Sequence, residues 1–475
     1  MINSQRPIHR VKQRLLTRLD DILLRCRGGC NASSRWYQQI EATIPSYQLP
    51  EVLMSCDGTR IADAQQWSAQ RRPEILELFR TFVYGRAPVA TVPAKGLVVS
   101  KQEGLLGGIA TLKEVRVELC GDASGPVMTL LLFLPNPQIA SPGRKPVFVG
   151  LNFFGNQTLH SDPKIPLTTS WVPNDRHTRG LPPERLRGLQ CSGWPVEFIL
   201  QRGYGLATAY CGEIVPDRPD GLDLGILHWY QTNHSFGKSA DSWGAIAGWA
   251  WGLSRAMDYL VQDDDVAANH VVVMGHSRLG KAALWAGAVD ERFAMVISNE
   301  SGCGGAALFR RRLRETISIV NRVNPHWFCH NFTQYNDNEA ALPVDQHMLL
   351  SLIAPRPLYI SSAQLDLAAD PMGEFLAAKH ASRLYRLLGT SGLPAEELPP
   401  ADAPVMGQIG YHMRKGRHAI TLFDWMQFVS FADKHFRRSA VPVGLRPPFT
   451  NDEEGGQQTI TSDQCLGNKS IGPEK

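Results

Sequence analysis

The chain has 475 residues and a formal charge of only +4, with 43% hydrophobic and 20% charged residues. This composition is typical of a globular protein with a large core, and it excludes fibrous proteins and disulfide scaffolds. The small charge gives no reason to expect a nucleic-acid partner. No apolar run approaches the roughly 18 residues that a membrane-spanning helix needs, so we expect no membrane span.

Residues 1–60 are expected to form an N-terminal helix followed by an extended lead-in. Apolar residues recur at helical spacing between Arg10 and Arg25, which predicts an amphipathic helix. Residues 28–60 contain the Gly, Ser and Pro clusters of a poorly ordered or extended segment. No uninterrupted apolar stretch of the kind found in secretory signals follows Met1, so the sequence leaves the localisation open.

Residues 61–438 are expected to form the main domain, which starts with one helix and three short strands. The helix follows Pro73, has an apolar face between Ile75 and Val83, and ends at Gly85. The strands are predicted at 97–100, 111–119 and 127–133. Because only short turn segments separate them, we expect antiparallel pairing.

From about Lys145 on, apolar strands alternate with helices. Continuous apolar runs, which are typical of strands buried on both faces, occur at 146–151, 204–210, 271–274, 293–298 and 358–361. Helices are predicted at 243–260 and 279–287. This alternation predicts an α/β fold with a mostly parallel central sheet covered on both faces. Residues 439–475 are polar and rich in Pro and Gly, and are expected to form a mobile tail.

The most informative segment runs from Asn269 to Lys281 and reads NHVVVMGHSRLGK. A short apolar strand leads into Gly275-His276-Ser277, and a helix follows. This context is typical of a nucleophile elbow, in which a sharp turn exposes a serine hydroxyl beside a helix N-terminus. Leu279 occupies the second glycine position of the common GxSxG pattern, so an ordinary strand-to-helix turn remains the alternative.

A serine nucleophile needs a base, and the base needs a third group that orients it. Four histidines follow the fifth apolar strand of the parallel region. His380 and His435 fall within helical patterns and are expected to be surface or packing residues. His418 follows a Lys-Gly turn and precedes a predicted helix, which makes it the preferred base. His412 is the alternative.

Two acids lie just past predicted strands, where they could orient such a histidine. Glu300 follows the fourth strand of the parallel region and Asp366 the fifth. For either acid alone, a solvated loop carboxylate is the more common case. His326, Cys329 and His330 lie close together in sequence, but no carboxylate or fourth ligand accompanies them, so no metal site is predicted.

These residues resemble carbohydrate esterase family 15, the glucuronoyl esterases. Residues 275–281, GHSRLGK, resemble the family motif G-C-S-R-x-G-K, with His276 in place of the fungal cysteine, and residues 298–305, SNESGCGG, resemble its acid-bearing loop. The resemblance covers roughly residues 45–438. It implies the three-layer α/β-hydrolase sandwich. Stretches that also resemble the bacterial branch are 71–84, 210–213, 326–329 and 416–425.

The resemblance implies a role for each candidate of the catalytic group. Ser277 matches the nucleophile and His418 the general base. Glu300 matches the family acid, and Asp366 matches a second acid of bacterial members. We favour Glu300 as the main group that orients the histidine, with Asp366 as its partner or substitute.

The resemblance also implies how substrate is held, without a metal or other cofactor. Arg278 matches a residue whose backbone N–H and guanidinium support the oxyanion and face the substrate. Lys281 and Glu315 match groups that bind the hydroxyls of the glucuronate ring. Ala368 departs from the family, because many members carry a tryptophan there that the sugar stacks on.

The sequence therefore predicts serine-dependent hydrolysis of esters of (4-O-methyl-)glucuronic acid, as in lignin–glucuronoxylan cross-links, through a glucuronoyl-serine intermediate. The expected partner is glucuronoxylan or a small glucuronate ester. Another serine esterase activity, on acetyl-xylan or aryl esters, stays open because of Ala368. A non-catalytic carbohydrate-binding relative is disfavoured by the intact Ser277, His418 and Glu300. Family members are generally secreted or periplasmic.

Overall fold

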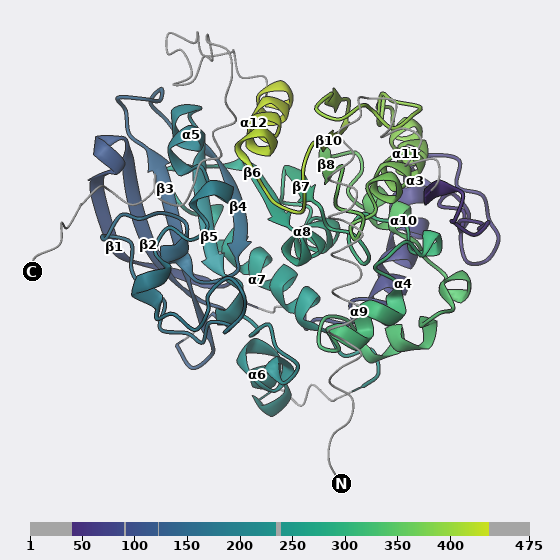
Figure 1. Ribbon diagram of the computed structural model, residues 1–475, viewed down its shortest axis with the longest axis horizontal. Coiled ribbons are helices and arrows are strands. Elements are labelled where there is room, and N and C mark those ends of the chain that lie inside the picture. The colour runs from purple at the N-terminus through teal and green to yellow at the C-terminus, as the bar shows by residue number, and fades with distance from the viewer. Residues whose placement is uncertain (1–39, 90–91, 122, 234–238, 437–475) are drawn as a thin grey trace, which may run out of the picture.

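The computed structural model in Figure 1 describes residues 40–89, 92–121, 123–233 and 239–436. The helix expected between Arg10 and Arg25 and the tail expected at 439–475 lie outside these ranges. Within them, no helix has both the length and the apolar character required to cross a bilayer. Among the cysteines that the structure describes, the buried Cys211, Cys303 and Cys329 are thiols outside any disulfide.

A ten-stranded sheet runs through the molecule in the order β1-β2-β3-β5-β4-β6-β7-β8-β10-β9. The strands β5, β4, β6, β7, β8 and β10 are parallel, whereas β1, β2, β3 and β9 pair antiparallel with their neighbours. This arrangement confirms the predicted mixed sheet. The strands are β1 (Lys95–Leu105), β2 (Ala110–Glu118), β3 (Val127–Pro135), β4 (Lys145–Asn152), β5 (Gly205–Tyr210), β6 (Val266–His276), β7 (Met295–Asn299), β8 (Leu358–Ala363), β9 (Val405–Met406) and β10 (Ile409–Arg414).

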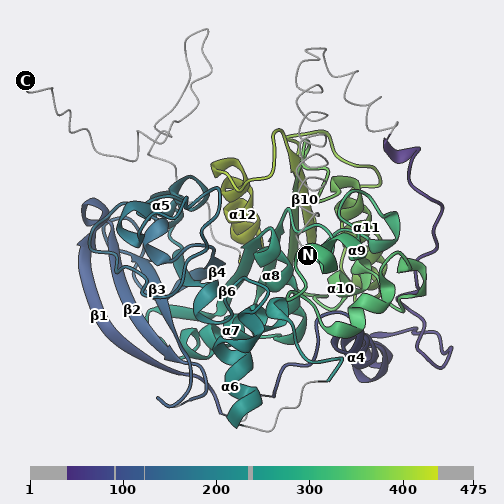
Figure 2. The ribbon, with the colours of Figure 1, turned by 60° about the horizontal axis from the view of Figure 1, so that its bottom comes forward.

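Helices cover both faces of this sheet (Figures 1 and 2). In β6, Val271 and Val273 belong to one hydrophobic core, whereas Val272 and Met274 belong to the other, as the two-residue period of a strand requires. The result is the three-layer sandwich of the α/β-hydrolase fold. The first core is closed by α4 (Arg72–Phe82), α7 (Ala245–Leu260), α8 (Arg278–Val289), α10 (Gln346–Ser351) and α11 (Pro371–Leu387), and the second by α5 (Val196–Gln201) and α12 (Leu422–His435).

Three further α-helices are α3 (Ala64–Gln66), α6 (Gly225–Asn233) and α9 (Ile317–Val323). The segment 40–60, assigned to the lead-in from the sequence, packs against the main domain. Val52 is buried in the first core, and Glu41 forms an ion pair with Arg311 at 2.7 Å.

The strands β9 and β10 were not predicted from the sequence. The strand β10 reads IGYHMR, and all of its residues are buried. Its polar members are compensated by partners from elsewhere: His412 lies 2.9 Å from Asp424, and Arg414 lies 2.6 Å from Glu300. A buried charge is tolerated only when it is paired, and such pairing is invisible in a hydrophobicity pattern.

Candidate active site

Ser277 lies in the sharp turn between β6 and α8. Its backbone has φ 57° and ψ −130°, a strained conformation for a residue with a side chain. The turn is held by hydrogen bonds from Ser277 N to Asn299 O at 2.9 Å and from Gly280 N to Ser277 O at 2.9 Å. A Cβ at position 275 would lie 2.1 Å from Leu279 O, so only glycine fits there. This geometry is that of a nucleophile elbow.

The sheet brings the other candidates to the same edge. Glu300 directly follows β7, Asp366 lies shortly after β8, and His418 lies between β10 and α12. Since β6, β7, β8 and β10 are parallel neighbours, their carboxyl ends meet along one edge. These residues were singled out from the sequence, although β10, the strand that precedes His418, was not predicted.

His418 contacts both acids through one nitrogen. Its Nδ1 lies 2.6 Å from Asp366 Oδ2 and 3.1 Å from Glu300 Oε2. Glu300 has two further partners, because its Oε1 lies 2.6 Å from Arg414 Nη2 and its Oε2 accepts from Ala419 N at 2.9 Å. The shorter contact is therefore to Asp366, whereas the sequence analysis favoured Glu300.

The electrostatics of this group stabilise a protonated imidazole. Burial acts to lower the pKa of His418, but the hydrogen bonds and charges of Asp366 and Glu300 outweigh it and raise that pKa. Burial raises the pKa of Glu300 to about 7 against the effects of His418 and Arg414. Burial also opposes ionisation of Asp366, yet its contact with His418 holds the pKa of this carboxyl below its ordinary value. Asp366 is thus the ionised partner of the imidazole.

These groups line a cavity of about 280 Å³. Among the described residues, the Ser277 hydroxyl has no hydrogen-bond partner. The hydrogen bond between a serine nucleophile and its base often forms fully only when substrate binds. The cavity contains both the reactive serine and the histidine. Its lining residues are Ser277, Lys281, Glu300, Ser301, Gly302, Glu315, Trp327, Asp366, Ala368, Ala369 and His418.

Lys281 and Glu315 form a polar part of this cavity. The ammonium of Lys281 is buried and donates to Ser301 O at 2.8 Å and to Cys303 O at 2.6 Å. It also lies 3.3 Å from Glu315 Oε2. These contacts engage the three N–H groups of the ammonium and fix the Glu315 carboxylate beside it at the cavity wall, where the carboxylate can accept hydrogen bonds from hydroxyl groups of a ligand.

The guanidinium of Arg278 pairs with Asp217, an acid that was not predicted from the sequence, and Arg278 is not among the residues that line the cavity. Its Nε lies 2.5 Å from Asp217 Oδ2, and its Cζ lies 4.5 Å above the Phe153 ring. Asp217 Oδ1 lies 2.8 Å from His326 Nε2 and accepts from Trp327 Nε1 at 2.9 Å. The sequence pointed to this group only through residues 326–329, a stretch that resembles the family but to which no role was assigned. Asp217 therefore links the arginine to the aromatic wall of the cavity.

Replacing Asp217 with asparagine is expected to lower kcat by about 10- to 100-fold, because the arginine beside the nucleophile loses its ionic partner and small misplacements near a reaction centre cost that much. The matched control is Asp220→Asn, an exposed acid whose carboxylate pairs with Arg218 at 2.7 Å. Steady-state kinetics on a glucuronate ester measures both variants. Equal kcat for Asp217→Asn and wild type would contradict this prediction.

The other candidate histidines have structural partners. His412, the alternative base, lies within β10 and is fully buried, with its Nδ1 3.0 Å from the Tyr359 hydroxyl. His435 on α12 contacts Gly407 O at 3.1 Å, and His380 lies on α11. None of the three lines the cavity at Ser277, so the geometry supports the preference for His418.

His276, Glu300 and His418 offer potential metal-ligand atoms within 4.8 Å of one another. Glu300 and His418 already pair with Arg414 and Asp366, and His276 Nδ1 is engaged by Asn299 Oδ1 at 2.6 Å. We therefore expect dialysis against EDTA to leave ester hydrolysis unchanged, as measured by initial rates. A loss of activity that added zinc restores would contradict the prediction that no metal is required.

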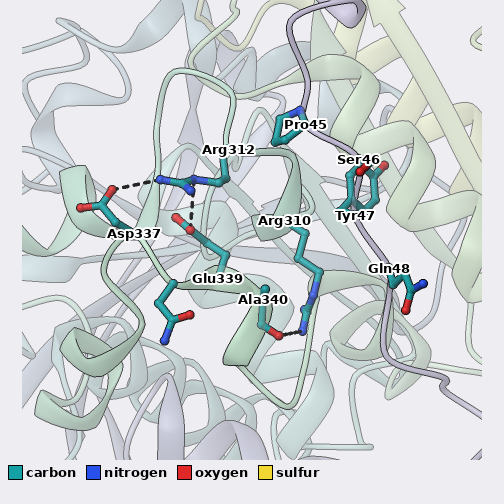
Figure 3. Close-up of a pocket in the computed structure, with 10 residues that line it drawn as sticks. Pro45, Ser46, Tyr47, Gln48, Arg310, Arg312, Asp337, Glu339 and Ala340 are labelled. Carbon is teal, nitrogen blue, oxygen red and sulfur yellow. Dashed lines mark hydrogen bonds and ion pairs between the residues drawn. The ribbon is translucent and has the colours of Figure 1, made fainter.

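A larger cavity of about 620 Å³ lies elsewhere on the chain and shares no lining residue with the one at Ser277. Figure 3 shows Arg312 between two carboxylates in this second cavity. Its Nη2 lies 3.2 Å from Asp337 Oδ1, and its Nε lies 3.2 Å from Glu339 Oε2. Size alone therefore does not identify the reactive site.

An α/β-hydrolase sheet that presents a serine at such a turn, with an acid-paired histidine at the same edge, places the chain among the serine hydrolases of this fold. A family model described as fungal glucuronyl esterase matches residues 231–389. The chain is 46% identical over 412 residues to carbohydrate esterase MZ0003 of an unknown prokaryotic organism, which covers 86% of this chain and 94% of that relative.

Solved structures agree with the sequence comparison. A glucuronoyl esterase from Solibacter usitatus is 44% identical with a TM-score of 0.77, covering 82% of this chain and 99% of that one. A promiscuous CE15 esterase from the marine bacterial metagenome is 46% identical with a TM-score of 0.77, covering 83% and 98%. The chain belongs to carbohydrate esterase family 15 and is a carboxylic ester hydrolase.

Proposed function

We propose that this chain hydrolyses esters of glucuronic acid, including 4-O-methyl-glucuronic acid, as in lignin–glucuronoxylan cross-links. The observation that carries the proposal is one cavity that contains Ser277 and His418 together with the polar pair Lys281 and Glu315. A uronic acid ester has its hydroxylated sugar on the acyl side, so its pocket needs donors and acceptors. The 4-O-methyl-glucuronoyl methylesterase of Cerrena unicolor, 27% identical and covering 81% of this chain and 68% of that enzyme, supports this substrate class.

The reaction proceeds by two acyl transfers. Ser277 attacks the ester carbonyl carbon while His418 takes the hydroxyl proton. Arg278 is the first residue of α8, so its backbone N–H has no carbonyl of a preceding helical turn to donate to. The tetrahedral oxyanion accepts a hydrogen bond from this N–H. When the C–O bond breaks, His418 gives its proton to the leaving alcohol. Water, deprotonated by His418, then attacks the acyl carbon of the glucuronoyl-serine. The acyl C–O bond to Ser277 breaks, His418 returns the proton to Ser277 Oγ, and the glucuronic acid is released.

The two acids have different parts in this scheme. Asp366 makes the shorter contact with His418 and stabilises the imidazolium that forms during each transfer. Glu300 binds Arg414 and the backbone of Ala419, so it mainly holds the loop that carries His418. Asp366 is therefore proposed as the main orienting acid, with Glu300 as its partner.

Ala368 keeps a second candidate activity open. It lines the cavity at the position where many family members carry tryptophan, so one wall lacks the aromatic face. One solved relative is described as a promiscuous esterase. Acetyl-xylan or aryl ester hydrolysis on this scaffold is the corresponding alternative.

The test compares benzyl glucuronate with benzyl cyclohexanecarboxylate, a matched ester without sugar hydroxyls, and with nitrophenyl acetate and acetylated xylan. We expect kcat/KM for the glucuronate ester to exceed that for its hydroxyl-free analogue by at least about 100-fold, because a site built to bind hydroxyls rejects the analogue that lacks them. Faster turnover of nitrophenyl acetate or acetylated xylan than of the glucuronate ester would favour the alternative activity.

A further inference from the structure

Glu374 is a fully buried carboxyl group that lies outside the cavity and has no part in the scheme above. It belongs to the first turn of α11, the helix that follows the loop of Asp366. A buried carboxyl group is costly unless it is well bonded, so its partners indicate why it is there.

The partners of Glu374 lie on both segments that carry the acids. Its Oε1 accepts from Ser301 N at 2.8 Å and from Gly302 N at 3.0 Å, directly after Glu300. Its Oε2 accepts from Ser362 Oγ at 2.6 Å, on the strand that leads to Asp366. One side chain therefore connects the end of β7 to the end of β8.

The turn after β7 needs such a connection. Glu300 has φ 48° and Gly302 has φ 58°, so two of three consecutive residues adopt the left-handed conformation. A non-glycine residue adopts this conformation only when its surroundings enforce it. The backbone N–H groups of Ser301 and Gly302 converge on one oxygen of the Glu374 carboxyl group and supply that restraint.

We propose that Glu374 is a positioning residue for ester hydrolysis, which fixes Glu300 and Asp366 at the distances that they need to orient His418. This inference rests on the proposed function. It assigns to α11 a task in the reaction although Glu374 touches neither the serine nor the histidine. Ser301 and Gly302 also line the cavity, so the same bonds shape its wall.

The test uses three variants of the full chain and one control. Glu374→Ala removes all of these bonds. Glu374→Gln keeps an oxygen for the two N–H groups and an amide that can donate to Ser362. Burial raises the pKa of Glu374 to about 8, so a neutral isostere is a fair replacement. Ser362→Ala removes only the bond to Oε2. Glu103→Ala, at an exposed acid of β1, is the control.

We expect Glu374→Ala to lower kcat on benzyl glucuronate by about 100-fold, and Glu374→Gln to restore most of it, because the acids are displaced in the first and held in the second. The downfield proton NMR signal of the His418 Nδ1–H should be lost in Glu374→Ala and retained in Glu374→Gln and Glu103→Ala. A merely structural role would lower the melting temperature without changing this signal or the kcat of folded enzyme.

An unchanged kcat in folded Glu374→Ala would overturn the inference, as would a glutamine variant as impaired as the alanine variant. Should Glu374→Ala fail to fold, Ser362→Ala decides: a lowered kcat supports the inference and an unchanged kcat overturns it. Wild-type protein that does not cleave benzyl glucuronate would instead contradict the proposed function. The two failures are therefore distinguishable.

Discussion

Replacing Ser277 with alanine is expected to abolish ester hydrolysis, with kcat lowered by more than about 10⁴-fold, because removal of a serine nucleophile leaves only the contributions of binding and the oxyanion site. The turn itself should persist, since alanine and serine tolerate the left-handed backbone at this position similarly. Initial rates on benzyl glucuronate, with circular dichroism as a check on folding, measure the effect.

A matched control is Ser430→Ala on α12, whose hydroxyl donates only to Met426 O. This variant should keep the wild-type rate. Mass spectrometry of acid-quenched wild-type enzyme should also detect the glucuronoyl adduct on Ser277. Full activity of Ser277→Ala would contradict a serine mechanism altogether, and with it the assignment of His418 as the base.

The second large effect is expected for Asp366→Asn, which should lower kcat by about 10³- to 10⁴-fold, because an amide neither stabilises the imidazolium nor favours the required tautomer. Glu300→Gln should lower kcat by a smaller factor, because Glu300 mainly binds Arg414 and the backbone N–H of Ala419. Comparing the two variants on benzyl glucuronate tests which acid orients the histidine. A larger loss for Glu300→Gln would support the assignment favoured from the sequence.

The pH profile gives an independent reading of the same pair. The base must be neutral to accept a proton, so activity falls as the pH drops below the pKa of His418. Asp366 raises that pKa, and its replacement by asparagine removes the effect. The acidic limb of kcat/KM should therefore move to lower pH in Asp366→Asn. An unmoved or higher acidic limb would contradict the proposed pairing.

The elements with strong periodicity could be predicted from the sequence. The apolar run at 271–274 became the centre of β6, and its two faces enter two different cores. The predicted helices at 243–260 and 279–287 correspond to α7 and α8. A strand buried on both faces leaves a short continuous apolar run, and a buried helix such as α7 leaves a longer one. Both signals can be read without knowledge of the partner elements.

The candidate nucleophile was equally accessible to sequence reasoning. Gly275 permits the close approach of Leu279 O, and the strand-to-helix context follows from residues within one short segment. The backbone conformation of a tight turn depends on a few consecutive residues, so it can be predicted from them. The strand β10 was not predictable in this way, because its buried His412 and Arg414 are paired with Asp424 on the following helix α12 and, for Arg414, with Glu300 after the distant strand β7.

The sequence by itself determined the family resemblance, the strands β1 to β8 with the residues that follow them, and the helices α4, α7 and α8. Only the tertiary structure decided how the loops after β7, β8 and β10 meet, and hence that His418 lies nearer Asp366 than Glu300. It also revealed the contacts of Asp217 and Glu374. The reason is that periodicity and turn geometry are local, whereas distances between side chains of different loops depend on the packing of the whole sheet.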